Sequence, residues 1–189
     1  MKLRTQILSL GLAGALIAVL VGASALVVSM LLSGALDDAF EANDALHASQ
    51  EADMMHDAIR SDVLLAWVGA LTGNPGQIDE GERGLREHAE VFDKAMAELD
   101  GMSLAPEARE AHRTAQPLVR RYVEEARGAI AQARVPNADP KATLDKLQTA
   151  FTELEDRMGA ISDTIGASGQ DVKAEAHMRV GRSRTGIVV

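Results

Sequence analysis

The longest uncharged stretch of the chain limits what the chain can fold into. Residues 5–36 contain no Asp, Glu, Lys or Arg, whereas Lys2 and Arg4 precede them and Asp37 and Asp38 follow. A helix rises about 1.5 Å per residue, so ~20 apolar residues cross a hydrocarbon layer ~30 Å thick. We therefore predict a transmembrane helix at residues 7–34, after a cytoplasmic N-terminus at residues 1–6.

A cleavable secretory signal is the alternative interpretation of this stretch. Lys2 and Arg4 would be its basic start, and Ala23-Ser24-Ala25 matches the small-residue cleavage pattern. The apolar run continues for about two turns beyond this triplet, to roughly twice the length of a typical signal core. A retained helix is therefore favoured. Its basic start and the acids after it place the N-terminus inside and the rest of the chain outside the cytoplasm.

The remainder of the chain is acidic and free of cysteine. Residues 37–184 contain all 28 acidic residues but 17 of the 19 basic ones, since Lys2 and Arg4 lie before this range. Their net charge is therefore −11. Such a charge argues against a nucleic-acid partner, which needs a basic surface. The absence of cysteine excludes disulfides and thiolate chemistry. Aromatic residues are scarce and runs of β-branched residues are missing here, whereas Ala, Glu, Leu, Arg and Met are abundant, which favours helices.

The first predicted helix continues from the membrane span without a helix breaker. No Pro or Gly lies between Gly34 and Gly69, and the next strong stop is the turn sequence Gly-Asn-Pro-Gly at residues 73–76. Apolar residues recur in this segment at helical spacing, so we expect a broad buried face. Its members are Phe40, Leu46, Met54, Met55, Ala58, Ile59, Val63, Leu65, Ala66 and Val68.

Three further helices are predicted after this turn. The second covers residues 78–100, and the third begins at Pro106 and should kink or break at Pro117. The fourth follows Asp139 as N-cap and Pro140 as first helical residue. Its apolar residues alternate in steps of three and four, which is typical of an inter-helix seam. The seam comprises Leu144, Leu147, Phe151, Leu154, Met158, Ile161, Ile165, Ser168 and Val172.

These elements predict an all-α fold, an N-terminal transmembrane helix continuous with an antiparallel up-down four-helix bundle. The bundle is expected at residues 35–184. A basic pair, Arg182 and Arg184, precedes the apolar residues 185–189, which we expect to start a second, truncated transmembrane helix. We therefore expect the chain to be a fragment or a truncated product.

With this layout, the chain resembles the N-terminal part of bacterial methyl-accepting chemotaxis proteins. The specific match is the segment Ala-Asp-Met-Met-His-Asp-Ala-Ile-Arg-Ser-Asp-Val-Leu at residues 52–64. The resemblance implies a chemoreceptor input module, anchored in the inner membrane lipid, with its sensor bundle in the periplasm. From the unbroken first helix and the regular seam of the fourth, we expect a homodimer through the first and fourth bundle helices, with any small-molecule ligand bound on the bundle or between subunits. The alternatives are the input domain of a histidine kinase or cyclase, and a truncated helical anchor without a signalling role.

One set of polar residues stands out as a candidate ligand site. Asp53, His56, Asp57 and Arg60 are three or four residues apart, which places them on one helical face. Arg60 could hold a ligand carboxylate through two hydrogen bonds, and His56 with an acid could bind a metal. The alternative is a solvated or dimer-facing strip of charge pairs, each contributing a few tenths of a kcal/mol. We assign no metal to this set.

No sequence motif indicates catalysis. Neither an activated Ser or Thr, nor a phosphate-binding glycine loop, nor a pair of carboxylates in a plausible pocket can be identified. His88 and His112 lie near the apolar stripes of the second and third helices, and we predict that they pack in the bundle. We therefore expect no enzyme activity and no cofactor.

Overall fold

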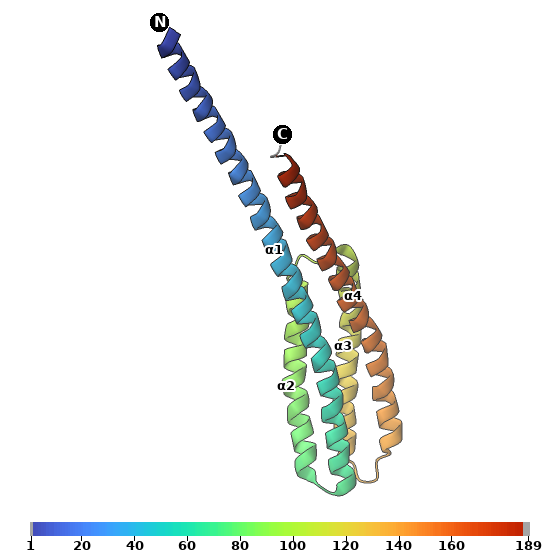
Figure 1. Cartoon of the computed structure of the whole chain (residues 1–189). Helices are drawn as coiled ribbons and strands as arrows, with labels where there is room; N and C mark the ends of the chain where they lie inside the picture. Colours follow the sequence, from blue (N-terminus) through green and yellow to red (C-terminus); the bar gives the residue numbers. More distant parts are fainter. Residues whose placement is uncertain (1, 187–189) are drawn as a thin grey trace. The chain divides into compact units, whose positions relative to one another are not determined.

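Over the residues that the structure describes, the chain folds into helices joined by short connections (Figure 1). The computed structural model describes the backbone of residues 2–186, and their side chains except at 2, 5, 171–173, 175–177 and 179–186. In this range it has four α-helices and no strand, which confirms the predicted all-α class. The helices are α1 (Lys2–Thr72), α2 (Pro75–Asp100), α3 (Pro106–Ala133) and α4 (Pro140–Gly186).

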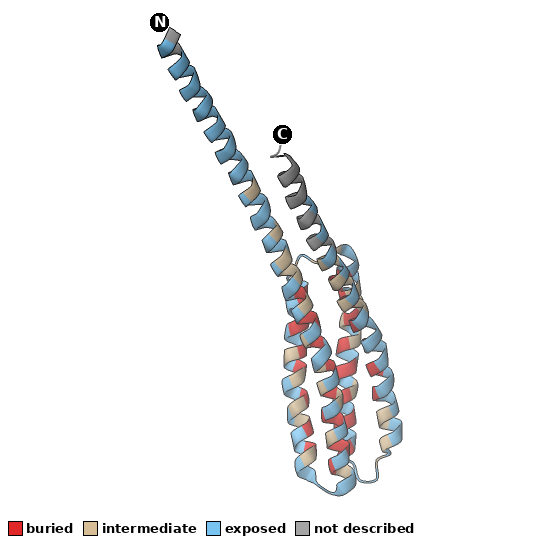
Figure 2. Ribbon diagram, viewed as in Figure 1, coloured by how far each residue is buried: buried red, intermediate tan, exposed pale blue. Residues whose placement is uncertain are grey.

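The chain divides into two compact units. One, the terminal unit, comprises Met1–Phe40 and Asp171–Val189, and the other, the bundle unit, is Glu41–Gln170. In the N-terminal part of α1, an 18-residue window is long and apolar enough to cross a membrane, and none of it is buried (Figure 2). A signal sequence near an N-terminus has the same features. The predicted start of a second span, residues 185–189, lies outside the residues whose side chains are described.

The connection between α1 and α2 is the predicted turn. Gly73 adopts a φ of 71°, which glycine tolerates without the steric cost of a Cβ atom. Asn74 caps α2, since its side-chain oxygen accepts a hydrogen bond from the Gly76 backbone N–H at 3.2 Å. Helix α2 therefore begins at Pro75, three residues before the predicted start at residue 78.

The starts of α3 and α4 agree with the sequence prediction. Helix α3 begins at Pro106, and α4 begins at Pro140. Asp139 caps α4, because its side chain accepts a hydrogen bond from the Lys141 N–H at 2.9 Å. Of the kink or break predicted at Pro117, the break is wrong, because α3 is one helix through this residue, and the kink stays a prediction. Pro117 is exposed, so water can bond the carbonyl that loses its helical partner.

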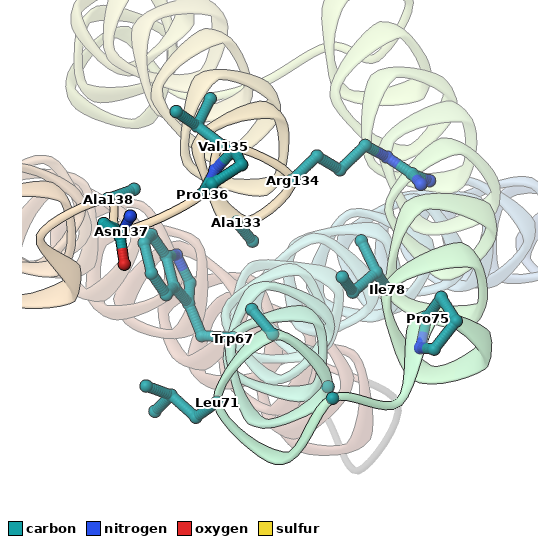
Figure 3. Close-up of a pocket in the computed structure, with 13 residues that line it drawn as sticks. Trp67, Leu71, Pro75, Ile78, Ala133, Arg134, Val135, Pro136, Asn137 and Ala138 are labelled. Carbon is teal, nitrogen blue, oxygen red and sulfur yellow. The ribbon is translucent and has the colours of Figure 1, made fainter.

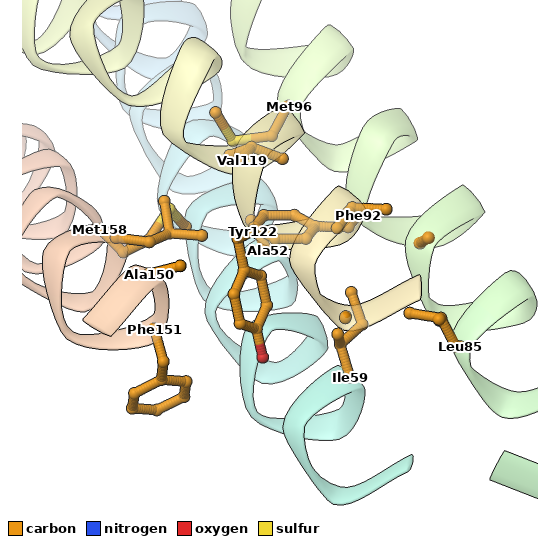
Figure 4. Close-up of a cluster of buried hydrophobic side chains, with 14 of the residues drawn as sticks. Ala52, Ile59, Leu85, Phe92, Met96, Val119, Tyr122, Ala150, Phe151 and Met158 are labelled. Carbon is orange, nitrogen blue, oxygen red and sulfur yellow. The ribbon is translucent and has the colours of Figure 1, made fainter. Parts of the chain in front are cut away.

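The bundle unit has one hydrophobic core to which all four helices contribute (Figure 2). Its centre contains Phe92 of α2, Tyr122 of α3 and Phe151 of α4, together with Ile59 of α1 (Figure 4). The predicted α4 seam is buried from Leu147 to Ile165, whereas Leu144 and Ser168 are half-buried. Val172 lies outside the described side chains.

Helix α1 differs most from its prediction. The broad buried face is wrong at Phe40, Met54 and Val68, which are exposed. Many of the buried residues of α1 are small. We call eight of them the inner stripe: Ala45, Ala48, Ser49, Ala52, His56, Ile59, Val63 and Ala66. Asp62, Trp67 and Gly69 of α1 are buried as well.

A second stripe of α1 faces away from the core. Its members follow steps of three and four residues and are all exposed: His47, Gln50, Met54, Asp57, Ser61, Leu64, Val68 and Leu71. Five large hydrophobic residues are exposed between Glu41 and Gln170, and four of them belong to this outer stripe; the fifth is Val135. The outer surface of the bundle unit is therefore apolar mainly along α1.

Candidate functional site

The four predicted site residues are on one side of α1, but they do not share one environment. His56 is buried, Arg60 is half-buried, and Asp53 and Asp57 are exposed. Asp57 belongs to the outer stripe and His56 to the inner stripe, so the set spans the boundary between the two. Arg60 has its guanidinium carbon 4.4 Å from the centre of the Phe151 ring, a cation–π distance, and no carboxylate within 4.0 Å among the described side chains.

His56 connects three helices inside the core. Its ring is stacked on Phe151 of α4, with centroids 4.0 Å apart and planes 12° apart. Its Nε2 lies 3.2 Å from the Phe151 carbonyl oxygen, so the proton is on Nε2 and is donated to that oxygen. The Tyr122 hydroxyl of α3 donates to the His56 carbonyl at 2.9 Å. These bonds satisfy polar groups that would be costly to bury unpaired.

The core holds His56 in its neutral form. Burial lowers the pKa of His56, because the charged imidazolium loses hydration, although the Asp57 charge opposes this shift. Burial likewise raises the pKa of Tyr122, which keeps its hydroxyl protonated as a donor. A neutral His56 that donates to a backbone carbonyl is a structural residue, and its other groups offer no metal site.

A second polar pair joins α1 to α2, and no pattern in the sequence predicts it. His88 Nδ1 lies 2.7 Å from the Asp62 carboxylate, and Asp62 is buried while His88 is half-buried. Burial raises the pKa of Asp62, against the effect of the His88 hydrogen bond. Two glycines of α2 make room for this residue: a Cβ atom on Gly84 would collide with the Asp62 carboxylate, and one on Gly81 with the Asp62 backbone oxygen.

His112 packs in the bundle, as predicted, at the α2–α3 connection. It is buried, and its Nε2 lies 2.9 Å from a carboxylate oxygen of Asp100, the last residue of α2. Gln116 donates to the other oxygen of Asp100 at 2.8 Å. This contact holds the end of α2 against α3.

A pocket of about 480 Å³ lies between the α1–α2 turn and the α3–α4 connection (Figure 3). We call it the Trp67 pocket, because the indole of the chain's one tryptophan forms part of its wall. Apolar residues supply most of the remaining wall, among them Leu71, Ile78, Ala133 and Val135. Volume and lining are in the range of sites for small organic molecules.

The Trp67 indole carries an unpaired donor. The side chain is 3% exposed, and its Nε1–H has no acceptor among the described protein atoms. A buried donor left without a partner costs about 1–3 kcal/mol. Sequence reasoning missed this residue, since a lone tryptophan at helical spacing looks like core packing.

Among the described residues, no group of three or more His, Asp and Glu is placed to hold a metal ion. Comparisons with protein-family models, with curated proteins and with solved structures gave no match.

Proposed function

We propose that the chain is the membrane-anchored sensory input module of a chemoreceptor-like protein. In this proposal an antiparallel up-down bundle lies in the periplasm and is continuous with a span in the inner membrane. The supporting observation is the length of α1, which runs from Lys2 to Thr72. One helix thereby supplies both the uncharged stretch and the inner stripe of the bundle, so a change in the bundle can reach the span.

The outer stripe of α1 supports a homodimer. A row of exposed apolar residues at steps of three and four matches the seam of a coiled coil and leaves apolar area in water unless it is covered. In the proposed dimer, α1 pairs with α1 of a second copy, and α4 contributes at the side. Asp57 and Arg60 then lie at or beside the subunit boundary, where a ligand carboxylate can accept from Arg60.

Polar contacts between α1 and α4 support the route of transmission. Ser49 and Ser162 share a hydrogen bond of 2.9 Å, and His56 donates to the Phe151 carbonyl. A shift of α1 relative to α4 would break both bonds, so the two helices have a defined register. A ligand that prefers one packing of these helices over another shifts the balance between the packings.

Topology is the first test. The chain has no cysteine, so single cysteines report without background. Ala97→Cys, exposed on α2, should react in intact cells with a maleimide that does not cross the inner membrane. Leu3→Cys should react only after permeabilisation. Labelling of Ala97→Cys only after permeabilisation would contradict the proposal.

Pairing along α1 is the second test. Oxidation of membranes that contain Ser61→Cys, on the outer stripe, should give a disulfide-linked dimer. Glu90→Cys, exposed on α2, is the matched control and should stay monomeric. Equal crosslinking of the two variants would remove the basis for the α1 interface.

Sensing itself requires an output. We expect a hybrid receptor, in which this chain replaces the input region of a chemoreceptor, to change swimming behaviour toward some member of a panel of amino acids and organic acids. Arg60→Ala should abolish a response to an acid, whereas Arg109→Ala, on α3, should not. A correctly inserted hybrid that responds to nothing in the panel and leaves basal swimming unchanged would favour a plain anchor.

A further inference from the structure

The Trp67 pocket has the features of a ligand site, and it is separate from the Asp57 and Arg60 boundary on α1. Its wall is built by α1, α2 and the residues 133–138 that end α3 and lead to α4. The wall of this cavity therefore includes the indole N–H of Trp67, a residue that is only 3% exposed. The cavity is large enough for a ligand with a single ring. The nitrogen-bearing edge of the indole is turned toward Ala133 and Pro136 (Figure 3).

The lining indicates the chemical class of the ligand. Because Leu71, Ile78 and Val135 offer no hydrogen bonds from their side chains, most of the ligand must be apolar. The unpaired indole N–H can only donate, so the ligand needs an acceptor.

The charges at the pocket decide between a neutral and an anionic acceptor. Arg134 is part of the lining, but its side chain extends toward α2 (Figure 3), where it donates to Asp79 at 2.7 Å and to Glu82 at 2.6 Å. Arg86 also pairs with Glu82, at 3.6 Å, so two cations balance these two carboxylates and Arg134 is already occupied. A ligand carboxylate would lose its hydration among apolar side chains without a free cation to pair with, which favours a neutral carbonyl or ether oxygen.

Access to the indole donor requires movement of the α3–α4 connection. The nitrogen has no appreciable exposed surface, so an acceptor reaches it only when the covering residues shift. Asn137 in this connection has a φ of 60°, a left-handed conformation that costs energy for a residue with a Cβ atom. A shift here is passed directly to the start of α4 at Pro140.

We propose that the Trp67 pocket binds a neutral, mostly apolar small molecule whose single acceptor oxygen takes the Trp67 indole N–H. A cyclic ketone is the simplest member of this class. A role of this pocket in sensing rests on the proposed sensory function. The binding of a ligand in it requires only the folded bundle unit. The experiment below measures binding alone, so its failure and the failure of the sensory proposal are distinguishable.

The single tryptophan makes the test direct. In the ¹⁵N-labelled full chain in lipid nanodiscs, one indole N–H cross-peak reports on this donor. Three probes share a six-membered ring: cyclohexanone, cyclohexanecarboxylate and cyclohexylammonium. We expect cyclohexanone to move the indole proton downfield in a saturable way, with a Kd on the order of millimolar for so small a ligand. Cyclohexanecarboxylate should bind at least ~10-fold more weakly, because its charge loses hydration in the apolar pocket without a free cation to pair with, and cyclohexylammonium, which is charged and has no acceptor, should leave the cross-peak in place.

Two matched variants locate the binding. Ala138→Phe fills the pocket from the α3–α4 connection and should abolish the cyclohexanone shift. Ala105→Phe, half-buried in the α2–α3 connection, should leave the shift intact. Circular dichroism checks that both variants keep their helices.

Three results would overturn the proposal. One is a cyclohexanone series that does not saturate, and another is a saturable shift that persists in Ala138→Phe. The third is equal affinity for the ketone and the carboxylate, which would refute the inferred neutral ligand.

Discussion

His56 shows how one side chain can fix the register of several helices. Its ring stacks on Phe151, its Nε2–H bonds the Phe151 carbonyl, and its own carbonyl receives the Tyr122 hydroxyl. An alanine or leucine at this position would fill space without choosing among neighbouring registers. Buried polar groups that are fully paired can specify a single packing in this way.

We predict that His56 makes the bundle sensitive to acid. Because burial lowers the pKa of the folded state below the 6.5 of the unfolded chain, the unfolded state binds more protons just below pH 6.5. The free energy of unfolding should therefore fall as the pH decreases from 6.5 to the lowered pKa, by at most about 1.4 kcal/mol per pH unit for this one proton. Urea denaturation of the full chain at several pH values, followed by Trp67 fluorescence, measures this slope.

His56→Phe is the matched variant for this prediction. It keeps a ring against Phe151 and cannot titrate, so its slope below pH 6.5 should be smaller than that of the original chain. Asp62, whose pKa is raised, acts in the opposite direction above its unfolded value of 3.8, but both chains contain it. Identical slopes in the two chains would show that His56 does not take up the proton.

The candidate residues could be found from spacing, but their orientation could not. Asp53, His56, Asp57 and Arg60 do lie on one side of α1, as the three- and four-residue steps predict. Which of them turns inward depends on Ala52 and Ile59 beside them, and an alanine carries little sequence signal for burial. The Asp62–His88 pair joins residues 26 positions apart, and only the packing of α1 on α2 brings them together.

At the scale of the helices, α1 and α2 approach each other closely at two glycines. A Cβ atom on Gly81 would meet the Asp62 backbone oxygen and the Ala66 side chain. Backbone atoms cannot turn away as a flexible side chain can, so the helices would have to separate. The close approach at Asp62 is thus set by the absence of a side chain.

We predict that Gly81→Ala destabilises the bundle, by up to about 2 kcal/mol. The alanine gains roughly 1 kcal/mol of helix propensity, but overpacking at a tight contact costs about 1–3 kcal/mol. Gly128→Ala on α3 is the control, because nothing lies within 4 Å of its Cβ position. It should stabilise the chain by about 0.5–1 kcal/mol. Urea denaturation compares the two, and a stabilised Gly81→Ala would refute the close contact.

The helix ends were predictable because local chemistry determines them. Pro106, Pro140 and the turn at Gly73 and Asn74 each act through their own backbone. The α4 seam was predictable for a related reason, since its large residues repeat without interruption. The core face of α1 was not, because two of its large residues, Met54 and Val68, turn outward, whereas small residues such as Ala48 and Ala52 are buried.

At the scale of the whole molecule, the outer stripe raises the question of what covers it. In the proposed function, membrane anchoring would restrict copies to one plane with a common orientation, which would raise the effective concentration of α1 faces for one another. The outer stripe of α1 could then support pairing between two copies of the chain, although so narrow an apolar row would hold a freely diffusing partner only weakly.

We predict that Met54→Glu weakens this pairing without unfolding the chain. The side chain is 59% exposed, so a charge is tolerated in the single subunit, whereas a dimer would place two like charges at the seam. In the Ser61→Cys background, the rate of disulfide formation should fall about 10-fold, as for a loss of ~1.4 kcal/mol. Ala131→Glu, exposed on α3, should leave the rate unchanged. An undiminished rate in Met54→Glu would place the seam elsewhere.

The division of α1 into a small inner stripe and a large outer stripe also determines which substitutions the chain can tolerate. A random library selected only for folded protein would lose enlargements at Ala48 and Ala52, where a neighbouring helix lies against each methyl group. It would keep many different residues at Met54 and Val68. Selection for pairing would narrow the choice at these outer positions as well. The difference between the two selections would separate the positions that fold one chain from those that join two.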